Sequence, residues 1–445
     1  MAELALLDWL SDASPERIAA FVNGLDEKEI TEWPFDWQSW ARTNQLAPAS
    51  DWRVWLVMAG RGFGKTRLGA EWVRGVAEAD PEARIALVGS SLHEARSVMV
   101  EGESGLLSIG APWRRPSYES SVRRLTWPNG AQAFLYSAGE PEALRGPQHS
   151  HAWCDEIAKW DNMSNRALST WDNLLMGLRL GSDPRLVATT TPRPVPLVAR
   201  IVGRQSLDMG EDVVVTRGTT FDNAANLPAR FIEAMRKTFG GTMLGRQELL
   251  GEMIEDLAGA LWSRRLIEGG REDVAPPCTR IVIGVDPPAS AHGDACGIVV
   301  CGIGDDRIAR VLADCSVEQA SPERWARAVV NAAQAWSADR VVAEANQGGE
   351  MVSAVLRAAQ ANLPLRLVHA SRGKAARAEP VAALYEAGRV RHAGMFARLE
   401  DELCGMMPGG EYQGPGRSPD RADACVWALT ELMLGQQAEP RIWFD

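Results

Sequence analysis

The chain has 445 residues, which is long for a single core, so we expect two domains. Hydrophobic residues make up 46% of the chain and charged residues 24%, a balance that excludes a disordered or fibrous protein. The net charge of −11 excludes a uniformly basic protein that coats nucleic acid, although a local basic patch could still bind it.

Targeting and redox signals point to the cytoplasm. The N-terminal stretch MAELALLDWLSDASPER has acids where a signal peptide needs a basic leader. No apolar run comes near the length of about 18–20 residues that a helix needs to span a bilayer, so we expect no membrane segment. The seven cysteines are scattered and odd in number, which favours free thiols in a reducing compartment.

The first half of the chain alternates short apolar runs with helical stretches, which is typical of a parallel sheet flanked by helices. We expect strands at 54–60, 84–90, 151–156, 185–192 and 212–220. Residues 123–138 predict a β-hairpin that turns at Pro128, Asn129 and Gly130. We therefore expect an α/β domain over residues 1–255, with a helical extension over residues 1–35.

The stretch 256–279 contains Gly-Ala, Gly-Gly and Pro-Pro pairs, which predict a linker. After it, strands are expected at 280–288, as a hairpin over 295–316, and at 340–346, and helices at 321–337, 349–361, 374–388, 394–407 and 421–435. This order predicts a second α/β domain with a mixed sheet over residues 280–445.

The sharpest motif is Ala-Gly-Arg-Gly-Phe-Gly-Lys-Thr at residues 59–66, between an expected strand and an expected helix. It departs from the Walker A pattern only by Ala59 in place of the first glycine. Small residues let backbone N–H groups wrap phosphate oxygens, Lys65 would neutralise the β and γ phosphates, and the Thr66 hydroxyl would ligate Mg²⁺. The expected nucleotide-binding residues are Gly60, Arg61, Gly62, Phe63, Gly64, Lys65 and Thr66.

An apolar strand followed by two acids, His-Ala-Trp-Cys-Asp-Glu at 151–156, supplies the partner that a phosphate loop needs. We expect Asp155 to hold the Mg²⁺ shell and Glu156 to orient and deprotonate the attacking water. A nucleotide kinase would not need the second acid, so the pair favours an ATPase.

Further residues of the first half are weaker candidates for the same site. Thr190 and Thr191 end a strand, where a hydroxyl could sense the γ-phosphate, and the Gln38 amide could read the adenine edge. Arg61 and Arg145 are candidates for stabilising transition-state charge, and each could equally be a surface ion-pair partner.

A second set of acids lies in the second half. Asp286 and Glu344 each end an expected strand, and Asp420 and Asp423 lie at i and i+3 at the start of an expected helix, with Ser418 as its cap and Pro419 in its first turn. Together these acids could bind two Mg²⁺ ions, as two-metal phosphodiester cleavage requires. Individually each could be an ordinary capping or solvated acid.

Residues 366–398 carry seven Lys or Arg residues and two acids, within an acidic chain. This local excess of positive charge predicts a surface that binds the phosphate backbone of a nucleic acid. The alternative is an ordinary solvent-exposed helical face.

The ordered motifs AGRGFGKT, HAWCDE and TTTP, followed by the Asp286, Glu344 and Asp420/Asp423 set, resemble those of the large terminase subunit of tailed phages. The resemblance spans roughly residues 35–430 and is nearest to the type found in prophages and gene transfer agents. It implies an N-terminal P-loop ATPase that drives double-stranded DNA into a procapsid, and a C-terminal ribonuclease-H-like endonuclease that cuts concatemeric DNA.

The resemblance also implies cofactors, partners and residue roles. The cofactors would be ATP and Mg²⁺, with Mn²⁺ as an alternative ion in the nuclease, and the partners a portal protein, a small terminase subunit and further copies in a ring on the procapsid, in the host cytoplasm. Arg61 would act in cis, the segment 190–192 would match the coupling motif, and Asp423 would be the third nuclease ligand with Asp420 auxiliary to it.

Two alternatives come from other classes. One is a helicase-like DNA translocase without nuclease activity, in which the C-terminal acids are structural. The other is a non-enzymatic assembly protein that uses the nucleotide site as a switch, for which Glu156 would be superfluous.

Overall fold

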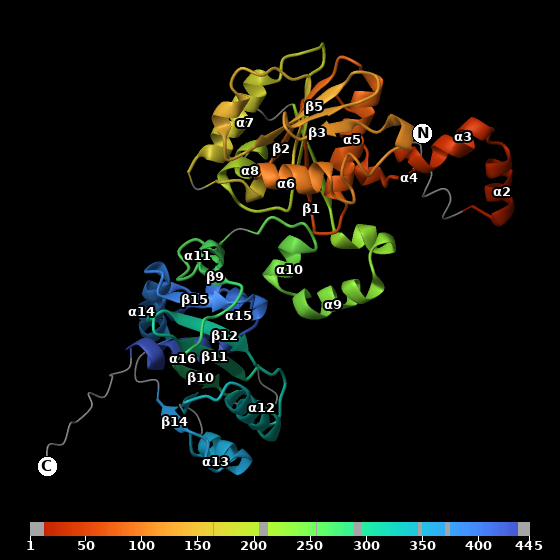
Figure 1. Ribbon diagram of the computed structural model, residues 1–445. Helices are drawn as coiled ribbons and strands as arrows, with labels where there is room; N and C mark the ends of the chain where they lie inside the picture. Colours follow the sequence, from red (N-terminus) through yellow and green to blue (C-terminus); the bar gives the residue numbers. More distant parts are fainter. Residues whose placement is uncertain are drawn as a thin grey trace. The chain divides into compact units, whose positions relative to one another are not determined.

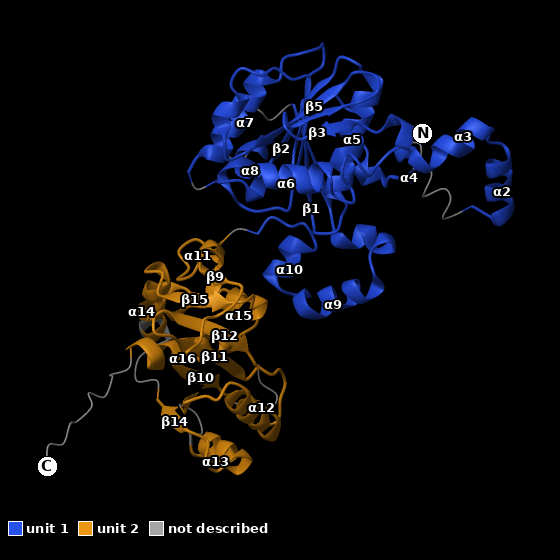
Figure 2. Ribbon diagram, in the orientation of Figure 1, with its two compact units in different colours: residues 1–255 blue, residues 256–445 orange. Residues whose placement is uncertain are grey.

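The structure, a computed structural model, describes residues 13–434 except 163, 204–211, 255, 289–294, 346–348 and 370–373. The chain divides into two compact units, residues 1–255 and residues 256–445 (Figure 2). Each unit is built around one β-sheet with helices against it (Figure 1). Among the helices of the described residues, none is both long enough and apolar enough to cross a membrane.

The first unit contains an eight-stranded sheet in the order β3-β4-β5-β2-β6-β7-β1-β8. The six strands from β5 to β8 in this order are parallel, and β4 and β3 extend the sheet antiparallel. The strands are β1 (Val54–Ala59), β2 (Arg84–Gly89), β3 (Ser117–Glu119), β4 (Arg124–Thr126), β5 (Gln132–Ser137), β6 (His151–Cys154), β7 (Arg185–Thr190) and β8 (Val213–Gly218). This confirms the five strands and the hairpin predicted in the first half of the chain.

The central strands of the first sheet are buried on both faces, which explains why their sequences are continuous apolar runs. In β1, Trp55 and Val57 point into one core cluster, and Leu56 and Met58 point into the other. Helix α5 (Lys65–Ala79) covers the first face, and helices α7 (Arg166–Gly177) and α8 (Pro196–Ile201) cover the second.

Further helices complete the first unit. They are α2 (Pro15–Asn23), α3 (Glu27–Glu32), α4 (Trp37–Trp40), α6 (Leu92–Glu94), α9 (Ala229–Phe239) and α10 (Met243–Glu248), with 3₁₀ or π turns η1 (Trp33–Phe35), η2 (Thr43–Gln45), η3 (Ala95–Val100), η4 (Pro112–Arg114), η5 (Pro141–Leu144), η6 (Ile157–Lys159) and η7 (Thr220–Asn226). The expected helical extension over residues 1–35 is present as α2, α3 and η1, and residues 1–12 of it lie outside the described residues.

The second unit contains a seven-stranded mixed sheet in the order β14-β13-β10-β11-β12-β15-β9. Its strands are β9 (Arg271–Glu272), β10 (Arg280–Asp286), β11 (Gly297–Ile303), β12 (Ala309–Asp314), β13 (Arg340–Glu344), β14 (Leu365–Val368) and β15 (Val390–Ala393). The central strands β10, β11 and β12 are antiparallel neighbours, and the outer pairs are parallel. The predicted mixed sheet is therefore confirmed.

Alternate residues of the second sheet face different helices. Val282 and Val342 lie in the core cluster that includes α16, whereas Ile283 and Val341 lie in the cluster that includes α12 and α13. The helical segments are α11 (Arg264–Gly269), α12 (Pro322–Ala335), α13 (Gly349–Ala359), α14 (Lys374–Glu386), α15 (Ala397–Cys404) and α16 (Asp420–Leu429), with turns η8 (Pro408–Gly410) and η9 (Thr430–Leu434).

The segment 256–279, expected as a linker, forms part of the second unit. It carries helix α11 and strand β9, and β9 pairs with β15 at the edge of the sheet. Trp262 and Ile267 are each 1% exposed and lie in the same core cluster as α16. The glycines and prolines of this segment punctuate short elements, so its composition resembles that of a linker although its apolar side chains are buried.

Candidate functional sites

Three neighbouring parallel strands bring the predicted nucleotide-binding motifs of the first unit to one edge of the sheet. β7 lies between β6 and β1, with Cys154 paired to Ala188 and Met58 paired to Thr190. The segments that follow these strands, namely the phosphate loop, Thr191 and the Asp155-Glu156 pair, therefore lie at the same edge. Ligands of open α/β sheets bind at this carboxyl edge.

The phosphate loop has a backbone that only glycine adopts readily. Gly62 and Gly64 have φ of 76° and 98°. A Cβ atom at Gly60 would lie 2.5 Å from the carbonyl oxygen of Leu249, so glycine is also required there by space. Helix α5 then begins at Lys65, which directs its N-terminal backbone N–H groups toward the loop.

Side chains from distant parts of the first unit hold this loop in place. The Arg42 guanidinium donates to the carbonyl oxygen of Phe63 at 2.5 Å, and the Asn223 amide donates to that of Gly62 at 2.7 Å. The Arg61 backbone N–H donates to the carbonyl oxygen of Glu248 at 2.7 Å. The loop is thus fixed from three directions before any nucleotide binds.

Lys65 is 7% exposed and surrounded by oxygen atoms. Its Nζ atom donates to the carbonyl oxygens of Ala59 and Gly60 at 3.0 and 3.3 Å. It also donates to the Thr191 hydroxyl at 3.2 Å and lies 3.3 Å from a carboxylate oxygen of Glu156. The ammonium group is therefore placed between the three motifs, where phosphate oxygens could replace these partners.

The two acids after β6 have different surroundings. Asp155 is buried and accepts a hydrogen bond from the Thr189 hydroxyl at 2.6 Å. Burial, and next the charge of Glu156, raise the pKa of Asp155 to about 6. Glu156 is partly exposed, has a φ of 48°, and accepts a hydrogen bond from the Thr191 backbone N–H at 3.1 Å. This left-handed conformation costs energy and holds the carboxylate beside Lys65.

Thr190, which ends β7, and Thr191, which follows it, have different neighbours. The Thr190 hydroxyl accepts from the Ala158 backbone N–H at 3.1 Å and donates to the Thr191 carbonyl oxygen at 2.8 Å, so it fixes the loop after β6. The Thr191 hydroxyl contacts Lys65. Of the two hydroxyls, that of Thr191 is the one placed to meet a phosphate.

A cavity of about 1360 Å³ opens over the phosphate loop, and its lining includes Lys65, Thr66, Glu156, Thr191, Gln45 and Glu248. Gln45, rather than Gln38, lies against the loop: a Cβ atom on Gly64 would be 2.7 Å from its amide nitrogen. Gln38 lines a neighbouring cavity of about 640 Å³.

The two candidate arginines are both exposed. Arg61, with 70% of its side chain exposed, donates to Glu248 at 2.5 Å. Arg145, at 67%, ion-pairs with Glu142 at 2.9 Å. Glu248 also lies 3.7 Å from Arg193, just after the Thr-Pro segment, and so links this segment to the phosphate loop.

Sequence reasoning did not identify Arg42, Gln45, Asn223 or Glu248 as parts of this site. Asn223 lies 161 positions from the glycine that it contacts, and Glu248 lies 187 positions from Arg61. No spacing rule links residues so distant, so only the fold identifies them.

In the second unit, Asp286 and Glu344 lie on adjacent parallel strands. Val285 pairs with Ala343, so the two acids that follow are neighbours at the carboxyl ends of β10 and β13. Asp286 lies four residues after Val282, and Glu344 lies two residues after Val342. Both valines belong to the core cluster that includes α16. Since alternate residues share a face, both acids project toward the face that α16 covers.

Helix α16 lies against the backbone of β10 and β11 because two glycines face it. A Cβ atom on Gly284 would lie 1.8 Å from the Ala424 carbonyl oxygen, and one on Gly297 would lie 1.9 Å from that of Asp420. Gly297 is paired with Asp286 across the strands. Asp420 is therefore placed close to Asp286.

The thiol of Cys296 supports this placement. Burial raises its pKa well above the usual value, and the charges of Asp286 and Asp420 raise it further. Both carboxylates therefore lie near one thiol.

Asp423 is 3% exposed and lies in the first turn of α16. Trp427, one turn further along the helix, donates its indole N–H to Glu344 at 2.7 Å. Arg377 also donates to Glu344 at 3.2 Å and lies over the Trp427 ring at 4.4 Å. The four predicted acids thus lie at the carboxyl ends of β10 and β13 and in the first turn of α16, which packs against β10 and β11.

The start of α16 differs from the prediction. The helix begins at Asp420 with Pro419 as its N-cap residue, and no side chain of that residue caps it, so Ser418 is not the cap. Instead, Glu402 of α15 accepts hydrogen bonds from the Arg421 and Ala422 backbone N–H groups at 2.7 and 3.1 Å.

The acids of the second unit suit a divalent metal by chemistry, since carboxylate oxygens are the donors that Mg²⁺ and Mn²⁺ prefer. In the part of the chain that the structure describes, no three His, Cys, Asp or Glu side chains lie together as a metal site requires. Glu344 in particular would have to exchange Arg377 for the cation.

Among the side chains that the structure describes, the basic residues of the segment 366–398 do not form one continuous track. Arg377 pairs with Glu344, Arg391 with Glu272 and Arg398 with Glu318, on three different parts of the unit. Arg372 lies outside the described residues. The sequence showed the excess of basic residues, but it could not show the acidic side chains with which the fold pairs them.

Arg366 belongs to a different cluster. Arg280, Arg340 and Arg366 share one buried carboxylate, Glu431, at 3.0, 2.6 and 2.6 Å. Their side chains are 37%, 42% and 53% exposed, so three partly exposed cations surround one anion. The cluster is a local positive region at the start of β10, whereas Asp286 lies at the other end of that strand.

Comparison with known proteins gives matches to both units. A family model described as "Terminase large subunit, T4likevirus-type, N-terminal" matches residues 56–268, and one described as "Terminase RNaseH-like domain" matches residues 283–432. A search of curated proteins gives no match.

Solved structures with similar folds include three from phages. The large terminase of a thermophilic bacteriophage has 12% identity and a TM-score of 0.39, covering 91% of this chain and 98% of that one. The HK97 bacteriophage large terminase has 15% identity and a TM-score of 0.35, covering 91% and 94%. The large terminase nuclease of the thermophilic phage G20c, with bound cobalt, has 15% identity and a TM-score of 0.32, covering 39% and 98%.

Proposed function

The chain belongs to the large terminase family, and from this premise we propose that its first unit hydrolyses ATP to move double-stranded DNA into a procapsid and that its second unit cuts the DNA. One observation carries the proposal: the chain combines Lys65 and Glu156 in contact at a phosphate loop with Asp286 and Glu344 on adjacent strand ends in the other unit. Neither alternative function needs both sites.

In the first unit, the loop from Gly60 to Gly64 and the start of α5 would hold the ATP phosphates. Lys65 would contact the β and γ phosphates, and Thr66 and Asp155 would hold Mg²⁺, which supplies positive charge to offset that of the phosphates. The raised pKa of Asp155 follows from its burial and from the neighbouring charge of Glu156.

Glu156 is the residue we infer to be the general base. Its carboxylate lies 3.3 Å from the Lys65 ammonium. When phosphate oxygens replace the Glu156 carboxylate as partners of Lys65, the carboxylate becomes available to orient a water molecule and accept its proton. Thr191, which contacts both residues, would report the state of the γ-phosphate to β7.

The arginines would stabilise charge that develops on the phosphates. Arg61 lies in the loop itself and would act in cis after leaving Glu248. Arg145 is exposed at 67% and would act on the nucleotide of a neighbouring subunit in a ring.

In the second unit, Asp286, Glu344 and Asp423, assisted by Asp420, would hold two divalent ions, Mg²⁺ or Mn²⁺. Such ions would supply positive charge to activate a water and to stabilise the leaving 3′-oxygen of a phosphodiester. The carboxylates share a helix-covered face, which supports this role. The Arg280, Arg340 and Arg366 cluster would contact backbone phosphates of the same duplex.

The partners follow from the family. We propose that the chain works in the cytoplasm of a bacterial host, as a homo-oligomeric ring on the portal protein of a procapsid, with a small terminase subunit that brings it to DNA.

Two substitutions in full-length protein test both activities, and each serves as the control for the other. Glu156→Gln should reduce ATP turnover by about 10²–10⁴-fold while leaving ATP binding and plasmid cutting intact. Asp286→Asn should abolish Mn²⁺-dependent plasmid cutting and spare ATP turnover. Parent-rate hydrolysis by Glu156→Gln would refute the base, and an Asp286→Asn protein that still linearises plasmid would refute the nuclease.

A further inference from the structure

Helix α16 carries two of the proposed metal ligands, yet its own sequence does not cap it. The N-cap position is Pro419, whose side chain makes no capping hydrogen bond. The first N–H groups of a helix have no partner within it and need one from elsewhere. Here one carboxylate oxygen of Glu402, in α15, accepts from both Arg421 and Ala422.

The carboxylate of Glu402 is held firmly at this position. Its second oxygen accepts from the Arg421 guanidinium at 2.8 Å, and its side chain is 6% exposed. Arg421 is itself fixed by Asp314 at 3.3 Å and by Glu318 at 3.1 Å. The cap is therefore a buried, oriented group rather than a mobile surface acid.

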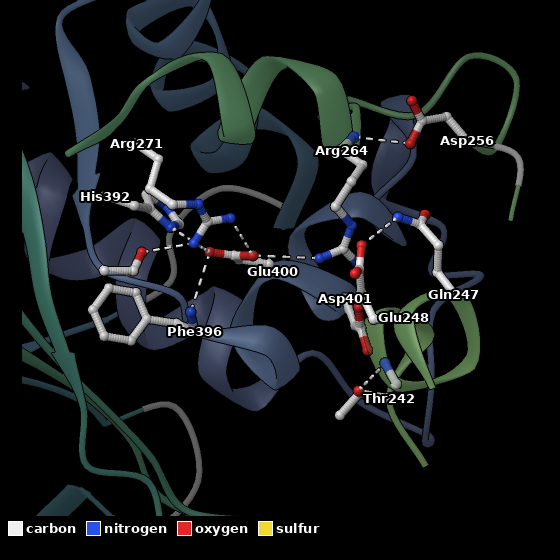
Figure 3. Close-up of polar contacts among 12 residues, drawn as sticks. Thr242, Gln247, Glu248, Asp256, Arg264, Arg271, His392, Phe396, Glu400 and Asp401 are labelled. Carbon is white, nitrogen blue, oxygen red and sulfur yellow. Dashed lines mark hydrogen bonds and ion pairs between the residues drawn. The ribbon is translucent and has the colours of Figure 1, made fainter. Parts of the chain in front are cut away.

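Helix α15 is also anchored on another side (Figure 3). The two residues before Glu402 ion-pair with arginines of the segment that precedes β10. Glu400 accepts from Arg271 at 2.9 and 3.0 Å, and Asp401 pairs with Arg264. Each of three consecutive acids of α15 therefore pairs with at least one arginine, and Arg264 contacts both Glu400 and Asp401, which fixes the helix that carries the cap.

The bonds to Glu402 lie between the proposed metal ligands. Arg421 and Ala422 separate Asp420 from Asp423 in the chain. Since α16 already touches the strand backbones at Gly284 and Gly297, little room remains for the helix to adjust elsewhere. Loss of the cap would leave the Arg421 and Ala422 N–H groups without this acceptor, and would thereby loosen the first turn and its two carboxylates.

We propose that Glu402 is a positioning residue of the nuclease, which caps α16 and thereby holds Asp420 and Asp423 against the strand ends of Asp286 and Glu344. The inference rests on the nuclease function proposed above. It adds to that function a group that touches neither metal nor DNA. Residues that orient metal ligands typically change metal affinity or activity by about 10–100-fold when they are replaced.

The test compares Glu402→Ala and Glu402→Gln with Glu318→Gln in the full chain. Glu318 is the matched control because it pairs with the same Arg421 guanidinium but is 55% exposed. Mn²⁺ binding is measured by calorimetry, with Asp155→Asn present in every protein to silence the metal site proposed in the first unit. Plasmid cutting is then measured against Mn²⁺ concentration, and thermal unfolding checks the fold.

We expect Glu402→Ala to weaken Mn²⁺ binding and to raise the Mn²⁺ concentration for half-maximal cutting, each by about 10–100-fold. Glu402→Gln should have a smaller effect because its amide oxygen still accepts from the helix, and Glu318→Gln should match the parent. Equal metal binding by Glu402→Ala and Glu318→Gln would overturn the inference. If Glu402→Ala fails to fold, the same comparison with Glu402→Gln decides. A parent protein that neither binds Mn²⁺ nor cuts would instead refute the nuclease itself.

Discussion

The carbonyl oxygen of Ala424 lies directly over Gly284, where a Cβ atom would be only 1.8 Å from it. Helix α16 thus rests on the backbone of β10 at the centre of the second sheet. Both partners of this contact are main-chain atoms, which cannot move away as a flexible side chain could. The position of the helix, and of the acids at its start, depends on the absence of one methyl group.

Gly284→Ala should therefore displace α16 and destabilise the second unit by about 3 kcal/mol, the upper end of the range for an overfilled core. Plasmid cutting should be lost and ATP turnover kept. Gly269→Ala is the control, because a Cβ atom at Gly269 would have no heavy atom within 4 Å. Urea unfolding checks the prediction, and equal stabilities of the two variants would contradict it.

The second prediction concerns acid stability. Burial disfavours the charge of Glu400, but His392 and Arg271 outweigh it and lower the pKa of Glu400 to about 2. Because its pKa is lowered, ionised Glu400 stabilises the fold at pH values above the ordinary pKa of 4.5. This contribution is lost as the pH falls toward 2. It amounts to about 3 kcal/mol for a shift of this size. Glu400→Gln should flatten the loss of stability between pH 5 and 2, measured by urea unfolding at each pH. Glu323→Gln, an exposed pair partner of Arg327, should follow the parent, and a parent-like acid dependence in Glu400→Gln would refute the assignment.

The third prediction concerns the ring. If Arg145 acts on the nucleotide of a neighbour, one defective subunit impairs an intact one. Mixing Arg145→Ala protein into the parent should lower ATP turnover by more than its molar fraction. Glu142→Gln, which alters the ion-pair partner of Arg145 without removing the arginine, is the control. A strictly proportional loss would leave no role for Arg145 across subunits.

The fourth prediction concerns DNA. Arg366→Gln should weaken binding of a short duplex, measured without metal, and reduce the slope of log K against log salt by about 0.9 for each phosphate that the protein no longer neutralises. Glu431 would keep Arg280 and Arg340, so the fold should tolerate the change. Arg327→Gln, on the exposed face of α12, is the control. Identical salt slopes for the two variants would show that the cluster is structural.

The sequence predicted most of the central elements because burial leaves a strong pattern in them. β1 is buried at every position, so it appears as an uninterrupted apolar run. The strands it missed are short: β9 has two residues, β3 has three, and β14 and β15 have four each. Strands of that length show no periodicity and are defined by the neighbours with which they pair.

The sites divide in the same way. Lys65 and Glu156 belong to local motifs, and the fold brings them within 3.3 Å. Ser418 has the residue type of a cap, but Glu402, 19 positions from the N–H of Arg421, performs that role. Capping by a residue from another helix is a tertiary contact, and no local pattern records it.

The anchoring of Glu400 decides where the chain can be divided for separate assays. A fragment that starts at residue 277 would exclude Arg264 and Arg271, and would also remove Trp262 and Ile267 from the core. Such a fragment could fail to cut DNA because it is misfolded, although its four candidate metal acids are present. An isolated second unit that reports on nuclease activity has to begin no later than Asp256, where the compact unit itself begins.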